Sequence, residues 1–322
     1  MTAMSSAHHS SQAAFNVVPI EAALGAEIRG IDLRALDAPL FELIHAAWLN
    51  HVLLVFRDQA LGAEDLVRLV RHFGTPVTSS NLHQRSLEER SANRLLNLPA
   101  EVTVVSNLKE DGKPIGILGD GEIAWHSDFS FKERPTAARM LVAMEIPPGA
   151  RGGNTFFLNC YAAFDALPAP LRKRVSGKTI KQGNIVDTAM KLRPGASLDV
   201  DIRQTPGPSH PIISTHPETG CNTLFLGRRH AACVNGSSLD ESEALLNELW
   251  SHATQPRFCY EHRWAVGDVV VWDNRATLHR RDAFDADSRR VLYAAQVEGH
   301  RPFEAADALS RPAHSRSKLF MR

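Results

Sequence analysis

The 322-residue sequence predicts a mostly β domain with flanking helices, of the sandwich or barrel kind. Short apolar runs with strand composition recur along the chain, and helical segments lie between them without an internal repeat. With 43% hydrophobic and 22% charged residues, the chain can bury a substantial core. Sandwich and barrel folds often reach this length as one domain, so size, composition and pattern indicate the same class.

The N-terminal part predicts two helices and a strand. Asp37 can cap a helix that begins near Pro39 and carries apolar residues at helical spacing. A strand over residues 52–56 follows, and a second helix is expected over residues 63–73. We expect these helices to cover a sheet rather than to carry catalysis.

Two further helices are expected in the second half of the chain. Residues 161–175 have helical character but contain two prolines, which predict a break. Ser238 and Glu241 fit a capping box for a helix that runs to about residue 253.

The triplet His126-Ser127-Asp128 lies in a predicted strand over residues 123–131, which is rich in aromatic residues. Side chains at positions i and i+2 of a strand leave on the same face, so His126 and Asp128 would project together. Unpaired polar groups on a buried face are costly and therefore need a reason. Metal ligation is one reason, and a plain hydrogen bond between the two side chains is the alternative.

A second triplet of the same kind, His216-Pro217-Glu218, is expected to be a solvated turn. Pro217 and Gly220 predict the tip of a hairpin between the apolar runs 211–215 and 222–226. A polar cluster at such a tip needs no ligand role.

His279 would complete a metal site. It follows a buried strand over residues 269–272 and a polar bend. Two imidazoles and one carboxylate on one side of a metal leave open positions for a co-substrate and dioxygen on Fe(II). The sequence therefore predicts an oxygenase, provided that the fold brings His279 to His126 and Asp128.

Arg290 lies eleven positions after His279, at the start of the apolar run 290–295. An arginine that enters a buried strand is costly unless it meets a carboxylate, and its planar fork suits a bidentate one. A dicarboxylate co-substrate would supply that partner. The hydroxyl of Thr155 could share the same carboxylate, although Thr155 is also an ordinary strand residue.

With these residues, the chain resembles the taurine dioxygenase and 2,4-dichlorophenoxyacetate dioxygenase family of Fe(II)- and 2-oxoglutarate-dependent oxygenases. The resemblance runs in family order from about residue 16 to about residue 303. The matching stretches are residues 24–33, 55–59, 125–128, 152–155 and 272–275, with His279 and Arg290. It implies a double-stranded β-helix, a cupin-like jelly roll with helices outside and the metal at one open end.

The resemblance also implies a role for each site residue. His126, Asp128 and His279 would be the iron ligands, and Arg290 and Thr155 would hold the distal carboxylate of 2-oxoglutarate. Dioxygen is the second co-substrate, and succinate and carbon dioxide leave as a small organic molecule is oxidised. Related halogenases replace the carboxylate ligand by a small residue, so Asp128 favours hydroxylation or an oxidation that follows from it. Desaturation and ring closure remain open.

The substrate is less defined than the chemistry. Both name-giving enzymes carry a second arginine four positions after the co-substrate arginine, and this chain has Ala294 there. This departure makes their mode of anion capture doubtful. A sulfonate or aryloxyalkanoate degrader and a tailoring enzyme for an amino acid or secondary metabolite are the alternatives within the class.

Substrate contacts are expected in and near two long polar stretches, residues 79–94 and 180–208, which would close over the substrate. The candidates are His83, Asn107, Glu122, Lys181 and Asn184.

Two other classes use the same residues. A hydrolase could hold zinc on the three ligands, but it needs no dicarboxylate anchor such as Arg290 with Thr155. A non-catalytic binding module would not need the intact ligand set.

Composition limits the partners and the compartment. Positive and negative residues balance at 36 each, which argues against a nucleic-acid partner. The basic clusters 228–230 and 280–281 are expected to be solvated surface, although Arg228 or Arg280 near the mouth could recruit an acidic substrate. No apolar run approaches the roughly 18 residues of a membrane span. Four cysteines without a pairing motif predict a reduced, cytoplasmic protein.

The expected organisation is a disordered leader over residues 1–15, a single oxygenase domain over residues 16–303 and a C-terminal tail over residues 304–322. The leader lacks the basic start and apolar core of a signal peptide. The sequence leaves a homo-oligomer open.

Overall fold

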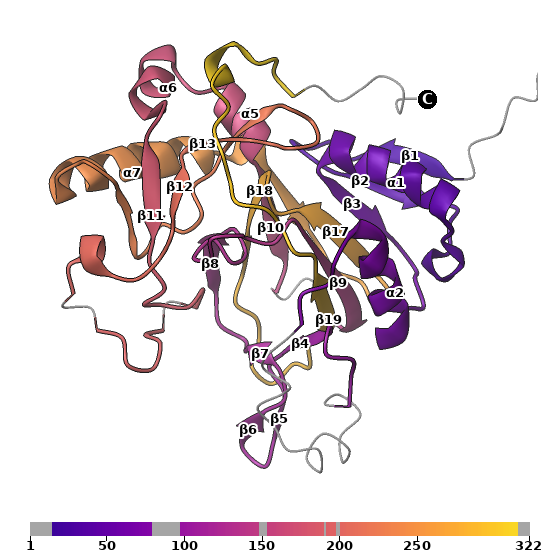
Figure 1. The fold of residues 1–322 in the computed structure, drawn as a ribbon. Coiled ribbons are helices and arrows are strands. Elements are labelled where there is room, and N and C mark those ends of the chain that lie inside the picture. Colours follow the sequence, from indigo (N-terminus) through magenta and orange to yellow (C-terminus); the bar gives the residue numbers. More distant parts are fainter. Residues whose placement is uncertain (1–14, 79–96, 148–152, 190, 198–199, 315–322) are drawn as a thin grey trace, which may run out of the picture.

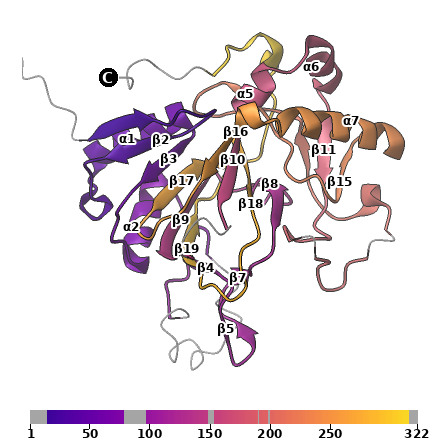
Figure 2. The same ribbon diagram turned by 180° about the vertical axis from the view of Figure 1, so that it is seen from behind.

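The computed structural model of the chain describes residues 15–78, 97–147, 153–189, 191–197 and 200–314. These residues form a mostly β structure in which two sheets face each other and helices lie outside them (Figures 1 and 2). The predictions for His83, for residues 79–94 and for most of the leader concern residues outside the described ones.

The larger sheet has eight strands in the order β1-β2-β3-β17-β9-β19-β4-β7. All neighbours pair antiparallel except β2 with β3 and β4 with β7. The strands are β1 (Asn16–Pro19), β2 (Ala26–Arg29), β3 (Leu53–Phe56), β17 (Val269–Asp273), β9 (Ala138–Glu145), β19 (Val291–Gln296), β4 (Thr103–Ser106) and β7 (Ile117–Leu118).

The smaller sheet has four antiparallel strands in the order β16-β10-β18-β8. They are β16 (Cys259–His262), β10 (Thr155–Asn159), β18 (Thr277–Arg281) and β8 (Ile123–His126). The two sheets meet through a shared core, where Phe157 of β10 and Trp272 of β17 pack edge to face at 5.2 Å between ring centroids. Because side chains alternate along a strand, each sheet turns one apolar face to the other and one to the helices.

The remaining strands form small sheets beside this pair. β11 (Thr179–Gln182) lies between β12 (Ser209–Pro211) and β15 (Ala232–Val234), and β13 (Ile213–Thr215) pairs with β14 (Asn222–Leu224). A two-stranded ribbon joins β5 (Lys109–Glu110) and β6 (Lys113–Pro114).

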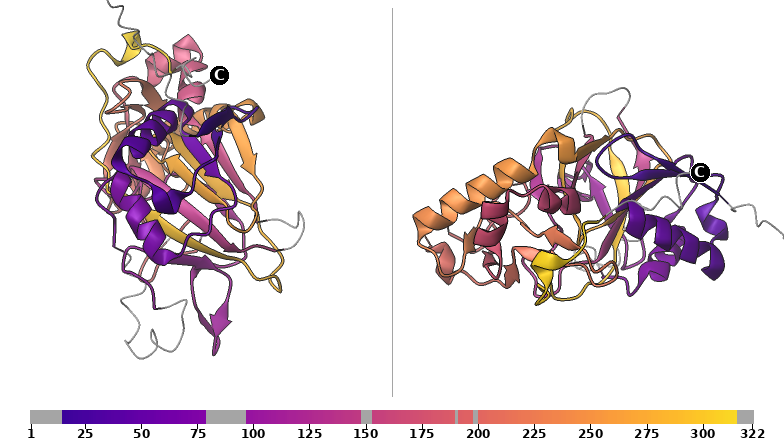
Figure 3. Two further views of the ribbon diagram at one scale, coloured as in Figure 1. Left: turned by 90° about the vertical axis from the view of Figure 1, so that its right-hand side faces the viewer. Right: turned by 90° about the horizontal axis from the view of Figure 1, so that it is seen from above.

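The helices cover the outer faces, with α1 and α2 on one side of the molecule and α7 on the other (Figure 3). The α-helices are α1 (Ala38–His51), α2 (Ala63–Phe73), α5 (Cys160–Asp165), α6 (Ala169–Val175) and α7 (Leu239–Ala253). Short 3-10 helices are η1 (Leu33–Ala35), η2 (Ile202–Gln204), η3 (Pro256–Phe258) and η4 (Ala308–Ser310). Apolar residues of α1 and α2 pack on the outer face of the larger sheet, and those of α5 and α7 join the outer face of the smaller one.

The predicted helix signals are confirmed. Asp37 accepts a hydrogen bond from the Leu40 amide at 2.9 Å, and Ser238 and Glu241 form the capping box of α7. The helical stretch after β10 is broken at Pro168, as the missing amide hydrogen of proline requires.

The predicted hairpin between β13 and β14 exists, and Pro217 and Glu218 at its tip are exposed as expected, but the expectation that His216 is solvated was wrong. His216 is 2% exposed, and its Nε2 lies 2.9 Å from Oδ2 of Asp273. Asp273 ends the buried strand β17, so its carboxylate needs partners, and His216 and Arg275 supply them.

The residues after 303 also pack on the domain. The Ala305 amide donates to Oγ1 of Thr215 at 3.0 Å, and Ala308 is buried in the core beside α7. None of the helices in the described part of the chain has the length and apolar character that a membrane span requires.

Candidate active site

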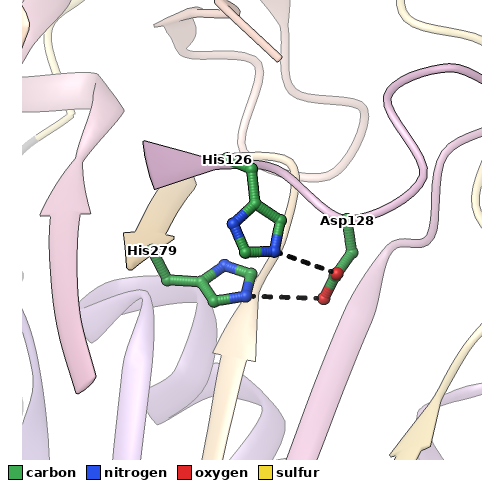
Figure 4. A group of neighbouring side chains, drawn as sticks. All are labelled: His126, Asp128 and His279. Atoms are coloured by element: carbon green, nitrogen blue, oxygen red, sulfur yellow. Dashed lines mark ion pairs between the residues drawn. The ribbon is translucent and has the colours of Figure 1, made fainter. Parts of the chain in front are cut away.

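Two histidines face each other across neighbouring strands. His126 ends β8, and His279 lies in the middle of β18, directly opposite it in the antiparallel register. Directly opposed residues project on the same face, so the two rings meet, with 4.1 Å between their centroids (Figure 4). The strand pairing therefore brings His279 to His126, whereas the sequence placed His279 at the end of a polar bend.

Asp128 completes the group from a turn. The prediction of a strand through residue 131 was wrong, because β8 ends at His126 and a turn follows. Asp128 Oδ1 lies 3.5 Å from Nε2 of His126, and its Oδ2 lies 3.7 Å from Nε2 of His279. One ligand atom from each of the three buried residues lies within 4.8 Å of the others, which is a geometry that can hold one metal ion.

Asn274 fixes the backbone that carries Asp128. The Asn274 side chain accepts from the Asp128 amide at 2.9 Å and donates to the Asp128 carbonyl at 3.0 Å. It also donates to the Thr136 carbonyl at 2.9 Å, so one buried amide joins three segments of chain. Sequence reasoning gave Asn274 no role. The available signal was its position directly after a buried strand, where a polar side chain needs partners.

The charges suit a divalent metal. His126 Nδ1 lies 2.8 Å from the Ala124 carbonyl, so a proton on Nδ1 leaves the Nε2 lone pair free toward the centre. Burial, followed by the nearby His126, lowers the pKa of His279 well below its ordinary value, so this ring is neutral. Burial would raise the pKa of Asp128, but Arg139, at 3.0 Å from its Oδ2, and the two imidazoles together hold that pKa far below its usual range. Two imidazole nitrogens and one carboxylate therefore converge.

Arg290 is a buried cation of the same domain, and it has no acidic partner among the described residues. It is 2% exposed, and its Nη2 donates to the Gly153 carbonyl at 3.0 Å. No carboxylate of the described residues lies within ion-pair distance of it. Burial, and next the repulsion of Arg281, lower the pKa of Arg290 to about 9. The side chain therefore stays charged at neutral pH, and its other N–H groups make no hydrogen bond within the described chain.

Gly153 lets the backbone approach this guanidinium. A Cβ at Gly153 would lie 3.1 Å from Nε of Arg290, and the residue has a φ of +73°. Thr155, two residues later, is buried, and its Oγ1 accepts from Nε1 of Trp264 at 3.0 Å. Since the hydroxyl accepts here, its own hydrogen remains free to donate.

A second buried arginine accompanies Arg290. Arg281 is 5% exposed, so its expected place on the solvated surface was wrong. As the last residue of β18, it lies two positions from His279 and therefore on the same face of the strand. Arg281 and Arg290 both lie against the ring of Phe284, at 5.1 and 5.5 Å. The Nε and Nη1 groups of Arg281 are buried without a partner in the described chain.

Arg280 and Arg228, the other two arginines named in the basic clusters, differ in their surroundings. Arg280 pairs with Asp282 and lies over the ring of Phe156 at 3.8 Å, on the face opposite to His279. Arg228 is 8% exposed, which also corrects the expectation of solvated surface.

The predicted substrate contacts lie in different places. Asn107 donates to the Ala286 and Ser288 carbonyls and accepts from the Arg290 amide, so it holds the turn that precedes Arg290. Glu122 is exposed, and Nζ of Lys181 donates to the Arg203 carbonyl from β11. The Asn184 side-chain oxygen is buried without a partner in the described residues.

The long stretch 180–208 is more structured than expected. It begins within β11, and Val186 bridges Leu192 in a short antiparallel turn. The Thr188 carbonyl accepts from the Ala124 amide at 3.2 Å, so this turn lies along the free edge of β8.

A convergent His-Asp-His set beside buried, unpaired guanidinium groups defines a metal-dependent enzyme with an anionic co-substrate. Comparison with known proteins agrees. Residues 16–296 match the family described as Taurine catabolism dioxygenase TauD, TfdA family, and the chain belongs to this family. It is an α-ketoglutarate-dependent dioxygenase, and the cofactor and co-substrates of this chemistry are Fe(II), 2-oxoglutarate and O2.

Similar proteins cover nearly the whole chain. The (S)-phenoxypropionate/alpha-ketoglutarate-dioxygenase of Sphingobium herbicidovorans is 31% identical over 308 residues, which are 91% of this chain and 98% of that protein. Pentalenolactone F synthase of Streptomyces arenae is 30% identical over 289 residues, which are 86% of this chain and 93% of that one. The crystal structure of a taurine dioxygenase from Burkholderia xenovorans has a TM-score of 0.69 and 30% identity, with 93% of this chain and 100% of that chain covered.

Proposed function

We propose that His126, Asp128 and His279 hold the Fe(II) of this dioxygenase, and that Arg290 and Thr155 bind the distal carboxylate of 2-oxoglutarate. The observation that carries the proposal is the convergence of three buried ligand atoms within 4.8 Å. The ligand set has the two nitrogens and one oxygen on one side that leave room for a bidentate co-substrate and dioxygen.

The unpaired guanidinium groups support the second half of the proposal. A buried arginine without a counter-ion is costly, and a dicarboxylate would relieve that cost for Arg290. The free hydroxyl hydrogen of Thr155 can donate to the same carboxylate. Arg281 adds a second positive charge nearby, which favours a dianion over a neutral ligand. These features also argue against a zinc hydrolase, which has no use for such an anchor.

When bound, Fe(II) with 2-oxoglutarate and O2 supplies the oxidation of a C–H bond, with one oxygen atom entering the substrate and the other entering succinate as CO2 is released. The chain itself needs no general base for this reaction. Its residues orient the reactants: Asn274 sets the position of Asp128, and Arg139 forms an ion pair with Oδ2 of that carboxylate. The aromatic and aliphatic core between the sheets excludes water from one side of the ligands.

We further assign the facing sheets to a double-stranded β-helix, and residues 16–303 to a single oxygenase domain against which residues 304–314 pack. The mostly antiparallel pairing of the two main sheets around the site supports this assignment. The free state of all four cysteines supports a reduced, cytoplasmic protein.

The substrate is a small organic molecule, and hydroxylation or an oxidation that follows from it is the proposed reaction. Asp128 occupies the position that a halide needs in related halogenases, so halogenation is disfavoured. The similar proteins are named for phenoxypropionate, taurine and pentalenolactone F, so degradation of an aryloxyalkanoate or sulfonate and tailoring of a metabolite both stay candidates.

Anaerobic addition of Fe(II) and 2-oxoglutarate tests the proposal. We expect a weak visible charge-transfer band in the wild type and none in His126→Ala. His252→Ala is the matched control, because His252 is also buried but bonds the Ala163 carbonyl from α7. A band of undiminished strength in His126→Ala would overturn the ligand assignment.

A further inference from the structure

Arg228 is placed to reach the metal side of the smaller sheet. It forms a backbone bridge with His126, and the Ser127 amide donates to the Gly227 carbonyl at 2.9 Å. Residues opposite each other in an antiparallel pair project on the same face, so the Arg228 side chain leaves on the face that carries the His126 ring. The charge of Asp128 acts on it, which agrees with this placement.

The guanidinium of Arg228 is buried and only partly hydrogen-bonded. The residue is 8% exposed, and its Nη1 donates to the Val186 carbonyl at 3.2 Å. Its Nε is buried without a hydrogen-bond partner among the described residues. The guanidinium lies over the ring of Phe131, 4.7 Å from the centroid. A small surface pocket is lined by Arg228, His126 and Asp187, among other residues.

A second guanidinium shares this location. Arg193 lies against the same Phe131 ring at 5.3 Å, and its Nε is also buried without a partner in the described chain. Arg193 and Arg228 repel each other, and burial is the largest cause that lowers the pKa of Arg228, to about 10. Arg228 is therefore charged at neutral pH. No carboxylate of the described residues forms an ion pair with either, since Asp128 is paired with Arg139 and Asp187 only acts from a distance.

Two neighbouring cations beside a reactive centre, without a counter-ion, indicate an anion that enters and leaves. It is not the distal carboxylate of 2-oxoglutarate, which the proposed function gives to Arg290 and Thr155. The strand β19 offers no further cation toward the substrate, because Ala294 is buried against the apolar core between the sheets.

We propose that Arg228, assisted by Arg193, binds an acidic group of the substrate, a carboxylate or a sulfonate, and so holds an organic anion beside the metal from the β8 edge. Arg228 is then a specificity-determining residue supplied by the loop after β14 rather than by β19. This inference rests on the proposed function, because it takes the metal position as the reacting centre.

The test uses pairs of compounds that share a skeleton but differ in charge. The probes are 2-phenoxypropionate with its amide, and 2-phenylethanesulfonate with its sulfonamide. Each is added to the anaerobic enzyme that carries Fe(II) and 2-oxoglutarate, and the dissociation constant is read from the change in the visible band. Succinate release in air then shows whether binding is coupled to turnover. The two pairs separate a carboxylate preference from a sulfonate preference.

We expect at least one acid to perturb the band and its neutral partner to bind far more weakly. Arg228→Gln should weaken the binding of that acid by about 10- to 100-fold, the equivalent of one lost charge-assisted hydrogen bond. Arg228→Lys keeps the positive charge but lacks the planar guanidinium. Its affinity for the acid should lie between those of the wild type and Arg228→Gln. Arg229→Gln is the matched control, because Arg229 is the next residue but pairs with Glu243 on α7. It should bind the acid like the wild type.

Three results would overturn the inference: equal binding of acid and neutral partner, unchanged binding of the acid in Arg228→Gln, or no response of the wild type to either acid. Each of these leaves the band itself intact. Loss of the band in the wild type would instead contradict the proposed function, so the two failures are distinguishable. A band of normal strength in Arg228→Gln also shows that the variant is folded.

Discussion

Two regions of the site balance their charges in different ways. The ligand end is formed by His126, Asp128 and His279, and the anion end is formed by Arg290 and Arg281. At the ligand end, Asp128 lies within 4 Å of both imidazoles and of Arg139, so its charge is compensated by the protein itself. At the anion end, Arg290 and Arg281 have no acidic partner among the described residues. On the proposed assignment, the chain assembles the metal ligands in advance, whereas the co-substrate completes the anion end. Changes at the two ends should therefore affect different quantities.

The largest effect is expected from Asp128→Ala. The variant loses the anionic ligand and leaves the buried Arg139 without its partner. We expect no stoichiometric Fe(II), succinate release at background level, and a free energy of unfolding lower by about 3 kcal/mol. Metal analysis measures the iron content, a turnover assay measures succinate release, and denaturant unfolding measures the free energy of unfolding. Asp282→Ala, which removes the more exposed partner of Arg280, is the control. Full iron content in Asp128→Ala would show that the ligand end does not need Asp128 to hold the metal.

Asn274→Ala should come next, because it disturbs the ligand end without removing a ligand. The variant leaves the Asp128 amide and the Thr136 carbonyl without their partner. We expect about 10- to 100-fold weaker Fe(II) binding and a free energy of unfolding lower by about 1–3 kcal/mol. Asn235→Ala, in the turn after β15 where the side chain bonds Thr179 and Ser209, should change metal binding little. Unaltered metal affinity in Asn274→Ala would mean that the turn holds Asp128 unaided.

The anion end should depend on pH in a way that the ligand end does not. The pKa of Arg290 is lowered to about 9 because burial disfavours its charge. Below pH 9 the guanidinium is charged and attracts the dicarboxylate. Above pH 9 the free enzyme loses this charge, so the dissociation constant of 2-oxoglutarate should rise by about tenfold per pH unit.

Stability moves in the opposite direction over the same window. The folded pKa of Arg290 lies below the unfolded value of 12.5, so above pH 9 the unfolded chain holds more protons. This group therefore makes the free energy of unfolding rise with pH there. Calorimetric titration with Ni(II) in place of Fe(II), from pH 7 to 10, measures the affinity. Arg290→Gln should show no such step, and a step that persists in that variant would assign it to another group.

The smallest effect is expected from Gly153→Ala, which changes only the shape of the anion end. The added Cβ would lie 3.1 Å from Nε of Arg290, at a positive φ. We expect a few-fold weaker 2-oxoglutarate binding and a loss of about 1 kcal/mol in stability. Gly112→Ala has a similar φ of +76° with no atom within 4 Å of the Cβ, so it should lose stability alone. Equal affinities in both variants would show that Arg290 tolerates the contact.

The sequence predicted more of the chemistry than of the local geometry. The residue types and order singled out His126, Asp128 and His279, which the fold brings together, and also the buried Arg290, because few structural roles need a buried histidine, aspartate and arginine together. Caps and prolines identified the helix ends, since these signals are local. The end of β8 at His126 was missed because Asn274, 148 residues further along the chain, determines where Asp128 lies.

Burial of polar residues was the main error. Arg228, Arg281 and His216 lie in polar stretches that are typical of solvated surface, yet all three are buried. Their burial depends on partners from distant strands, such as Asp273 for His216, and on ligands that are not part of the chain. A sequence pattern with no information on strand order cannot specify such contacts.

The affinity of 2-oxoglutarate in two neighbouring variants tests the central claim most directly. Arg289 is exposed and pairs with Glu145, whereas Arg290 is buried without an acidic partner. In an anaerobic titration of the visible band, Arg290→Ala should weaken 2-oxoglutarate binding by about 10- to 100-fold, and Arg289→Ala should match the wild type. Wild-type affinity in Arg290→Ala would contradict the account.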